Sequence, residues 1–370
     1  MKFIALPYAK TDISRHKFGI CARYRHDAGI FIELYDDIIP TASKTSPGEY
    51  WSRNMGTKDL VQEKFCFGEA ETMAKILVTG GAGFIGHALV KRLLEKGFEV
   101  TVADLKPSRH SGVQQIVGDL LDPQILKTSL SPGTDAVIHL AAFTSVLKSL
   151  SIPYQVYETN LKMTMDLLEQ SRQIGVRQFL LASSNAVVGN VGSVPIHEEM
   201  ILKPLTPYGA TKAACEMLLT TYQHAYGIQG ASLRMTNVYG TGMMNKDSMI
   251  PRLMRTALGQ APVHIYGNGE QVRDYIFLDD VVETFLMTIE QGLNGPLTVG
   301  FGRSVSVNAL VDMARKATGT PIPVDYVDPK PGEMPAVVVD TGKLQSLGLT
   351  PRVDLPEGLK LVWEDFKHFS

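Results

Sequence analysis

The chain has 370 residues, of which 44% are hydrophobic, and its formal net charge at pH 7 is −2. This composition is typical of a globular protein with a large core, and the charge balance excludes the strongly basic surface of nucleic-acid-binding proteins. No apolar run approaches the ~18 residues that a membrane-spanning helix needs. Cys21, Cys66 and Cys215 lack metal-site spacing, so we expect no metal and a reducing compartment such as the cytoplasm.

Residues 1–72 form an N-terminal extension that precedes the motifs described below. Its acidic residues, among them Asp12 and Glu33, argue against a transit peptide, and residues 1–6 are too short an apolar run for a secretory signal. Two interpretations remain open. The extension is an accessory segment that packs on the core or on a partner, or translation starts at Met73 and the segment is not part of the protein.

A glycine-rich turn follows a short apolar run at residues 75–79. This run is rich in β-branched residues and predicts a buried parallel strand. Gly80, Gly83 and Gly86 follow it, and apolar residues then recur at helical spacing from Phe84 onward. In this context the first glycine permits a tight turn, the second lets the backbone approach a pyrophosphate, and the third lets helix and strand pack closely. The phosphates of a dinucleotide would bind free N–H groups at the start of the helix. The alternative is a plain strand–helix turn.

An acidic residue ends the next predicted strand, at residues 99–103. Asp104 follows Gly86 at close to the ~20-residue spacing expected of the acid that binds the ribose 2′-hydroxyl. A carboxylate at this position favours NAD, because it repels the 2′-phosphate of NADP. The alternative is a solvated loop carboxylate.

A tyrosine and a lysine stand four residues apart in the stretch Thr206-Pro-Tyr-Gly-Ala-Thr-Lys212. This spacing places Tyr208 and Lys212 on one face of a helix, and Pro207 suits the first turn of that helix. A lysine cation one turn away is expected to lower the tyrosine pKa from its usual value near ~10. Tyr208 could then act as a general base or acid near neutral pH. The alternative is an ordinary surface helix.

Together these motifs resemble those of the extended short-chain dehydrogenases/reductases, in the nucleotide-sugar epimerase/dehydratase branch that includes UDP-glucose/galactose 4-epimerases. The resemblance extends from about Lys75 to the C-terminus. The motifs that carry it are Gly80 to Gly86, Gly118-Asp-Leu120, His139-Leu-Ala-Ala142, Asn160, Ser183-Ser184, Tyr208 to Lys212, Arg234 to Gly240 and Tyr266 to Asp280.

The strand–helix alternation from Lys75 to about Val238 predicts an α/β fold with a doubly wound parallel sheet, or Rossmann fold. We expect an NAD-binding domain at residues 73–238 and a smaller α/β substrate-binding domain mainly at 239–370. Near residues 274–300 the chain is expected to return to the NAD-binding domain. The resemblance also implies a homodimer, paired through helices near 154–173 and 208–226.

The resemblance implies a role for each matching residue. Catalysis would use Ser184, Tyr208 and Lys212, with Ser184 relaying a proton between the sugar and Tyr208. The implied NAD-binding residues are Gly80, Gly83, Phe84, Ile85, Gly86, Asp104, Asp119, Leu120, Ala141, Ala142, Tyr208 and Lys212. The implied substrate-binding residues are Ser184, Asn237, Arg273 and Lys330, the last three on the diphosphate. For the charges of Arg273 and Lys330, solvated surface positions are the alternative.

Departures from the family pattern reduce the number of activities that the chain could have. The dehydratases carry an acidic pair directly after the catalytic serine or threonine, where this chain has Asn185 and Ala186. Neither residue can serve as a general acid or base, so the sequence argues against dehydration. Val188 stands where several relatives have tyrosine, and Val337 falls near a position that gates the sugar pocket in 4-epimerases. Met163 replaces a common glycine, and we assign it no function.

The sequence therefore predicts NAD-dependent epimerisation of a nucleotide-diphosphate sugar, at C4, through a transient 4-keto intermediate. Two alternatives remain. One is a reductase or dehydrogenase that consumes NAD(H) stoichiometrically on a nucleotide sugar or a related alcohol or ketone. The other is a non-catalytic NAD-binding regulatory protein, which would need no proton relay.

Overall fold

The structure is a computed structural model that describes residues 11–16, 19–25, 31–35, 74–329 and 334–368. The chain divides into two compact units, Met1–Glu63 and Lys64–Ser370, and each is described by itself. Met73, the alternative start, and Lys330, a predicted substrate residue, lie outside the described residues.

The first unit contains an antiparallel three-stranded sheet in the order β1-β2-β3. The strands are β1 (Thr11–His16), β2 (Gly19–Arg25) and β3 (Phe31–Tyr35). Each strand pairs with the next along the chain, so the unit is a meander.

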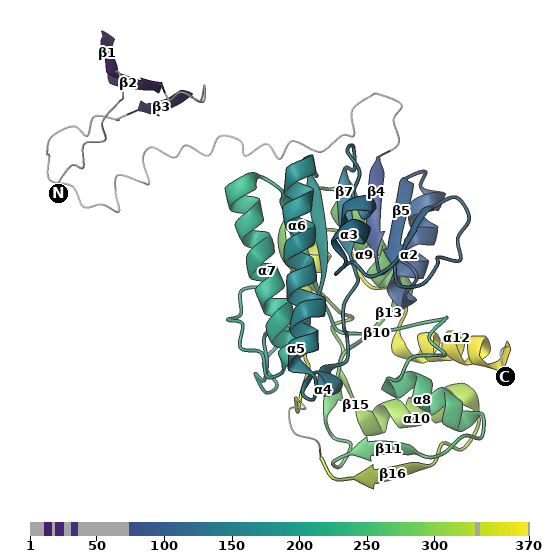
Figure 1. Cartoon of the computed structure of the whole chain (residues 1–370). Helices are drawn as coiled ribbons and strands as arrows, with labels where there is room; N and C mark the ends of the chain where they lie inside the picture. The colour runs from purple at the N-terminus through teal and green to yellow at the C-terminus, as the bar shows by residue number, and fades with distance from the viewer. Residues whose placement is uncertain (1–10, 17–18, 26–30, 36–73, 330–333, 369–370) are drawn as a thin grey trace, which may run out of the picture. The chain divides into compact units, whose positions relative to one another are not determined.

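The second unit is built around a parallel seven-stranded sheet in the order β14-β9-β8-β7-β4-β5-β6 (Figure 1). Its strands are β4 (Lys75–Thr79), β5 (Glu99–Asp104), β6 (Gln114–Val117), β7 (Ala136–His139), β8 (Gln178–Ser184), β9 (Gln229–Met235) and β14 (Gly295–Val299). The strand order reverses between β4 and β7, and such a reversal creates the crevice where ligands bind in open α/β sheets. The predicted doubly wound fold is confirmed.

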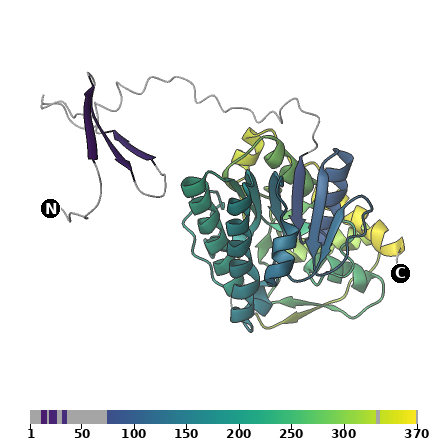
Figure 2. The same cartoon turned by 45° about the horizontal axis from the view of Figure 1, so that its top comes forward.

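Helices cover both faces of this sheet, which is why its central strands are almost continuously apolar. Ile76 and Val78 of β4 face one core together with α2 (Phe84–Glu95) and α9 (Leu278–Glu290). Leu77, between them, faces the opposite core. That core is shared with α3 (Pro123–Ser129), α6 (Met163–Ile174) and α7 (Pro207–Tyr226), as seen from a second direction in Figure 2.

The helical stretch predicted near residues 154–173 contains a π-helical insertion. The chain runs through α5 (Pro153–Val156), a π-helix at Tyr157–Lys162 and then α6. Such insertions often occur at functional sites. Here the insertion contains the fully buried Asn160, which contacts both a loop of the sheet and α7.

A smaller lobe follows β10 (Asn237–Tyr239), with its own apolar core. Its elements are α8 (Met249–Ala257), β11 (Val263–Tyr266), β12 (Val272–Arg273), β15 (Val305–Ser306), α10 (Val307–Thr318), β16 (Val324–Val327) and α12 (Leu355–His368). Between β12 and β15 the chain passes through β13 (Tyr275–Phe277), α9 and β14, and β14 lies beside β9 at the edge of the main sheet. Short helices occur at α4 (Val146–Ser149), Asn185–Val187 and α11 (Gly342–Ser346). Within the described part of the chain, no helix has the length and apolarity needed to span a membrane.

A buried histidine links β4, β7 and α6. His139 Nδ1 lies 2.7 Å from Thr79 Oγ1, and its Nε2 lies 3.0 Å from Thr164 Oγ1. Burial, with a smaller effect of the Lys212 charge, lowers the pKa of His139 from 6.5 to about 3. The folded protein therefore holds this imidazole in its neutral form.

Because His139 is buried in its neutral form, we expect the folded protein to lose stability in acid. The unfolded chain protonates His139 below about pH 6.5 while the folded protein does not, so its stabilising contribution is present above that pH and is lost as the pH falls toward 3. His139 alone should contribute a slope of about 1.4 kcal/mol per pH unit to the free energy of unfolding in that window. Urea unfolding at pH 7, 6 and 5 measures the slope. It should be shallower in His139→Gln and unchanged in His224→Gln, an exposed control. Equal slopes in all three proteins would contradict this account.

Candidate active site

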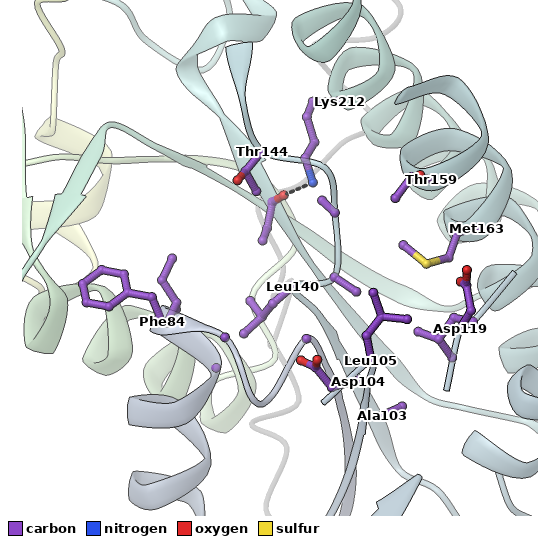
Figure 3. A pocket seen from close by; sticks show the side chains of 18 of the residues that line it. Phe84, Ala103, Asp104, Leu105, Asp119, Leu140, Thr144, Thr159, Met163 and Lys212 are labelled. Atoms are coloured by element: carbon purple, nitrogen blue, oxygen red, sulfur yellow. Dashed lines mark hydrogen bonds between the residues drawn. The ribbon is translucent and has the colours of Figure 1, made fainter. Parts of the chain in front are cut away.

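A cavity of about 350 Å³ opens at the carboxyl ends of β4, β5, β6 and β7, and residues at the ends of β8 and β9 also line it (Figure 3). Every residue that the sequence predicted to bind the cofactor lines it. These residues are Gly80, Gly83, Phe84, Ile85, Gly86, Asp104, Asp119, Leu120, Ala141, Ala142, Tyr208 and Lys212. Residues from four strand ends and from α7 therefore surround one space, at the place in the fold where an α/β sheet binds its ligand.

The glycine turn is tight enough to require glycine at two positions. Gly80 has a φ of +70°, and a Cβ there would lie 2.7 Å from the Ala141 nitrogen. A Cβ on Gly86 would lie 2.2 Å from the Gly80 oxygen, so α2 could not pack on the turn. Gly83 precedes α2, which begins without a side-chain cap. Its first N–H groups can therefore bind phosphate oxygens, and the cradle fits a dinucleotide.

Two acids stand where the adenosine half of a dinucleotide would bind. Asp104 lies at the end of β5, and its two carboxylate oxygens accept hydrogen bonds from the Ala82 and Lys106 N–H groups at 3.0 Å each. The bond to Ala82 fixes the carboxylate beside the glycine turn, and each oxygen keeps a second lone pair for a ribose hydroxyl. Asp119 follows β6 and accepts a bond from the Leu121 N–H.

Tyr208 and Lys212 line the cavity, and Ser184 adjoins it through Tyr208. Tyr208 is only 7% exposed and hydrogen-bonds Ser184. The ammonium of Lys212 is also buried and donates to the Ala182 carbonyl at 2.8 Å, as Figure 3 shows. Hydroxyl, phenol and ammonium groups are thus placed together for proton transfer at the cavity wall.

The electrostatics differ from the expectation for Tyr208. We expected Lys212 to lower its pKa, but burial raises the pKa of Tyr208, and only the hydrogen bond with Ser184 opposes that shift. The reason is that both groups lose water when α7 packs on β8, while the Lys212 ammonium is directed at Ala182. Burial likewise lowers the pKa of Lys212, although Cys215 and Glu216 act in the opposite direction.

The sequence profile of the NAD dependent epimerase/dehydratase family matches residues 76–300. The chain belongs to this family. A UDP-glucose 4-epimerase from Halalkalibacterium halodurans is 34% identical over 302 residues, which cover 75% of this chain and 90% of that protein.

Solved structures agree with this membership. The UDP-glucose 4-epimerase from Thermotoga maritima with UDP-glucose is 35% identical and superposes with a TM-score of 0.76, covering 80% of this chain and 99% of that one. The UDP-N-acetylglucosamine 4-epimerase from Methanobrevibacter ruminantium, in complex with UDP-N-acetylmuramic acid, is 28% identical with a TM-score of 0.76, covering 81% and 100% of the two chains.

The residues predicted to bind substrate are not all brought to the same cavity. Ser184 adjoins it through Tyr208. Asn237 lies on β10, where its side-chain amide donates to the Asp274 carbonyl at 2.8 Å. Arg273 lies on β12 with its guanidinium bonded to the Val272 carbonyl, and neither Asn237 nor Arg273 lines the cavity.

The departures from the dehydratase pattern have a structural counterpart. Asn185 and Ala186 form a short 3₁₀-helix directly after Ser184, whose hydroxyl accepts a hydrogen bond from the Ala186 N–H. No carboxyl group follows Ser184 there. Val188 and Val337, which are far apart in the sequence, are both buried in one apolar cluster.

Sequence reasoning missed several residues that line the cavity, including Thr144, Thr159, Met163, Met235 and Lys246. Met163 was noted as an unusual residue without a function. Its position at the start of α6, directly after the π-helical insertion, brings it to the cavity wall. The closeness of Thr159 to the motif residue Asn160 was a usable signal, whereas Lys246 carried none.

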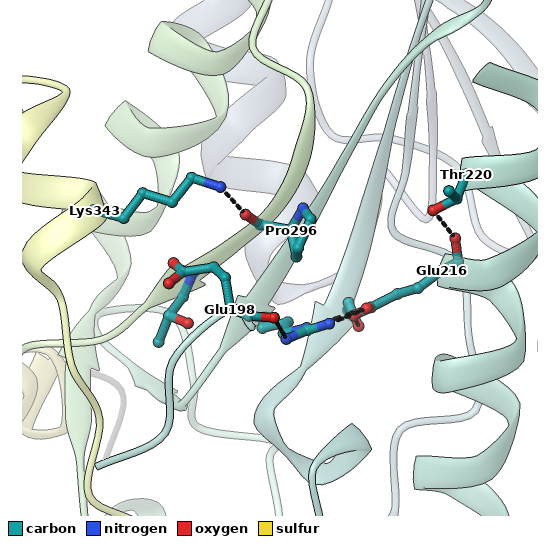
Figure 4. Close-up of polar contacts among 8 residues, drawn as sticks. Glu198, Glu216, Thr220, Pro296 and Lys343 are labelled. Carbon is teal, nitrogen blue, oxygen red and sulfur yellow. Dashed lines mark hydrogen bonds and ion pairs between the residues drawn. The ribbon is translucent and has the colours of Figure 1, made fainter. Parts of the chain in front are cut away.

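A buried ion pair holds α7 against the sheet. Glu216, one turn after Lys212, binds the Arg234 guanidinium through Nε and Nη2, the latter at 2.7 Å, with both side chains less than 10% exposed (Figure 4). Ser183 donates to the same carboxylate, and Arg234 also donates to the Glu198 carbonyl at 2.9 Å. The pair therefore ties α7 to β8 and β9 directly behind the Ser184–Tyr208 contact.

Removal of this carboxylate should destabilise the protein strongly. Glu216→Gln leaves the Arg234 guanidinium buried without a counter-charge, which typically costs about 3–5 kcal/mol. Glu283→Gln is the matched control, because the Glu283–Arg92 pair is about 40% exposed and is expected to contribute at most ~1 kcal/mol. Urea denaturation of both variants measures the difference. Similar free energies of unfolding for the two would show that the buried pair has no special role.

Proposed function

We propose that this protein is a 4-epimerase of a nucleotide-diphosphate sugar with NAD as cofactor, and that UDP-hexoses are its substrates. One observation carries the proposal: Tyr208 and Lys212 line the cavity beside the glycine turn, Ser184 hydrogen-bonds Tyr208, and no general acid for dehydration follows Ser184. The names of its relatives, UDP-glucose 4-epimerase among them, support the choice of sugar class.

The chain's own residues perform the acid–base chemistry. Tyr208, as phenolate, accepts the proton of the sugar 4-hydroxyl, with Ser184 bridging the two oxygens. NAD, held by the glycine turn from Gly80 to Gly86, would supply the hydride acceptor and donor for C4 of the sugar. Tyr208 then donates the proton back, so no net oxidation occurs.

The raised pKa of Tyr208 has a consequence for this step. Because burial disfavours the phenolate, the phenolate needs positive charge nearby before it can serve as a base at neutral pH. The Lys212 ammonium does not supply this charge by itself, because it is bound to the Ala182 carbonyl and does not lower the pKa of Tyr208. The positive charge of an oxidised nicotinamide in this cavity would favour the phenolate, so that proton abstraction and cofactor occupancy are coupled.

Inversion at C4 requires the sugar to turn while the nucleotide stays bound. We assign the diphosphate anchor to Asn237, Arg273 and Lys330. Arg273 suits this role because a guanidinium can bind phosphate oxygens in a bidentate manner. A fixed diphosphate permits rotation of the keto sugar without release from the enzyme.

We also propose that the enzyme is a cytoplasmic homodimer. Large apolar side chains are exposed on the neighbouring segments α5 to α6 and α7, as expected of an interface. Tyr154 is 72% exposed and Met217 is 65% exposed. The few cysteines, without paired spacing, support a reducing compartment.

The function is tested by Tyr208→Phe. This variant removes the proton-transfer group while keeping the ring that lines the cavity, so turnover should fall by about 10²–10⁴-fold with NAD binding nearly intact. NMR of the sugar anomeric protons measures turnover, and the NAD content of the purified protein measures binding. Tyr222→Phe, in the same helix and half-buried, should keep full activity. Full activity in Tyr208→Phe would refute the assignment.

A further inference from the structure

Two lysines, Lys212 and Lys246, are among the residues that line the cofactor cavity, and they come from different parts of the chain. Lys246 belongs to the connection between β10 and α8, which leads into the smaller lobe. Its Nζ lies 5.1 Å from the centre of the Phe84 ring, and both residues line the cavity. Phe84 is the first residue of α2 and directly follows Gly83. The ammonium is therefore near the helix start that the glycine turn prepares for a diphosphate.

The backbone that carries Lys246 is well anchored. Its N–H donates to the Met243 carbonyl at 2.9 Å, and Met243 is fully buried. Arg255 of α8 donates to the carbonyls of Met244 and Lys246 at 2.8 and 3.1 Å. These contacts fix the turn, so the position of the lysine follows from the packing of the lobe.

The charge of Lys246 is not matched by an acid within the described part of the chain. Its neighbour Asp247 pairs instead with Arg252, at 2.7 Å. Lys246 is an exposed residue, but desolvation of its ammonium beside the cavity lowers the pKa, and no carboxylate acts in the opposite direction. The contact with the Phe84 ring supplies only a weak cation–π attraction. An anion bound beside this ammonium would satisfy it.

We propose that Lys246 is a diphosphate-binding residue of the cofactor site. Its side chain reaches from the smaller lobe to the place at the start of α2 where the pyrophosphate of the cofactor would bind. The inference rests on the proposed use of NAD by this cavity. The cofactor's diphosphate is favoured over the substrate's because Lys246 shares the cavity wall with Gly83 and Phe84, whereas Asn237 and Arg273 do not line it.

This contact has a consequence for the reaction. An epimerase regenerates its cofactor in each cycle and has no need to release it. If Lys246 of the smaller lobe binds the cofactor's diphosphate, the cofactor contacts both the smaller lobe and the main sheet. This double contact slows dissociation of the cofactor between turnovers.

The test compares Lys246→Met with Lys246→Arg. Methionine keeps much of the side-chain length and removes the charge, so the dissociation constant for NAD, measured by calorimetry, should rise by roughly tenfold or more. Arginine should keep it within a few-fold. Lys91→Met, an exposed lysine elsewhere on α2 that does not line the cavity, is the control and should bind NAD normally. Thermal unfolding of the unliganded variants should stay unchanged.

Two further ligands locate the contact. ADP-ribose contains the diphosphate and should show the same loss of affinity in Lys246→Met, whereas adenosine lacks it and should bind both proteins equally. Unchanged NAD and ADP-ribose affinity, with a raised KM for the UDP-sugar, would assign Lys246 to the substrate's diphosphate and overturn the proposal. Because NAD binding is measured directly, this result is separate from a failure of the protein to epimerise any sugar.

Discussion

The burial of the Lys212 ammonium against β8 is the constraint on which the site depends. A buried cation is unfavourable unless polar groups compensate for its lost water. The Ala182 carbonyl provides a hydrogen bond, and the charge of Glu216 on the next turn favours the protonated form. Glu216 is in turn held by Arg234. Helix α7 therefore cannot shift along the sheet without breaking the buried Glu216–Arg234 ion pair, and Tyr208 stays in contact with Ser184.

A second rigid element sets the opposite wall of the cavity. The turn after β4 approaches the loop after β7 so closely that Gly80 has no room for a side chain. Asn160, from the π-helical insertion, bonds the Phe143 N–H at 2.7 Å and Thr211 of α7 at 3.1 Å. The buried amide of Asn160 thus connects the loop after β7 to α7, and the same loop packs against the glycine turn at Gly80.

The parts of the site that could be predicted from the sequence are those encoded locally. Strand, glycine turn and helix are adjacent in the chain, and Tyr208 and Lys212 share a helix face by spacing alone. Lys246 reaches the cavity only through tertiary folding, from a segment without a motif, and Met235 lies in a motif whose sequence did not indicate that this side chain faces the cofactor cavity. The pKa of Tyr208 was misjudged for the same reason, because neighbouring charges can be read from a sequence while burial depends on how α7 packs. The return of β14 to the sheet edge was visible as a short apolar run, but its partner β9 is set by the fold.

The central claim is that hydride leaves and returns to the same carbon within one bound complex. The most direct test is to incubate the purified protein with UDP-glucose, UDP-N-acetylglucosamine and UDP-glucuronate, each carrying deuterium at C4, with only a catalytic trace of NAD. NMR would follow the anomeric signals and the label. We expect a new C4 epimer that retains its deuterium, with no net change in cofactor absorbance. Turnover that requires stoichiometric NADH or NAD, or loss of the label from C4, would contradict the account and indicate a reductase or dehydrogenase.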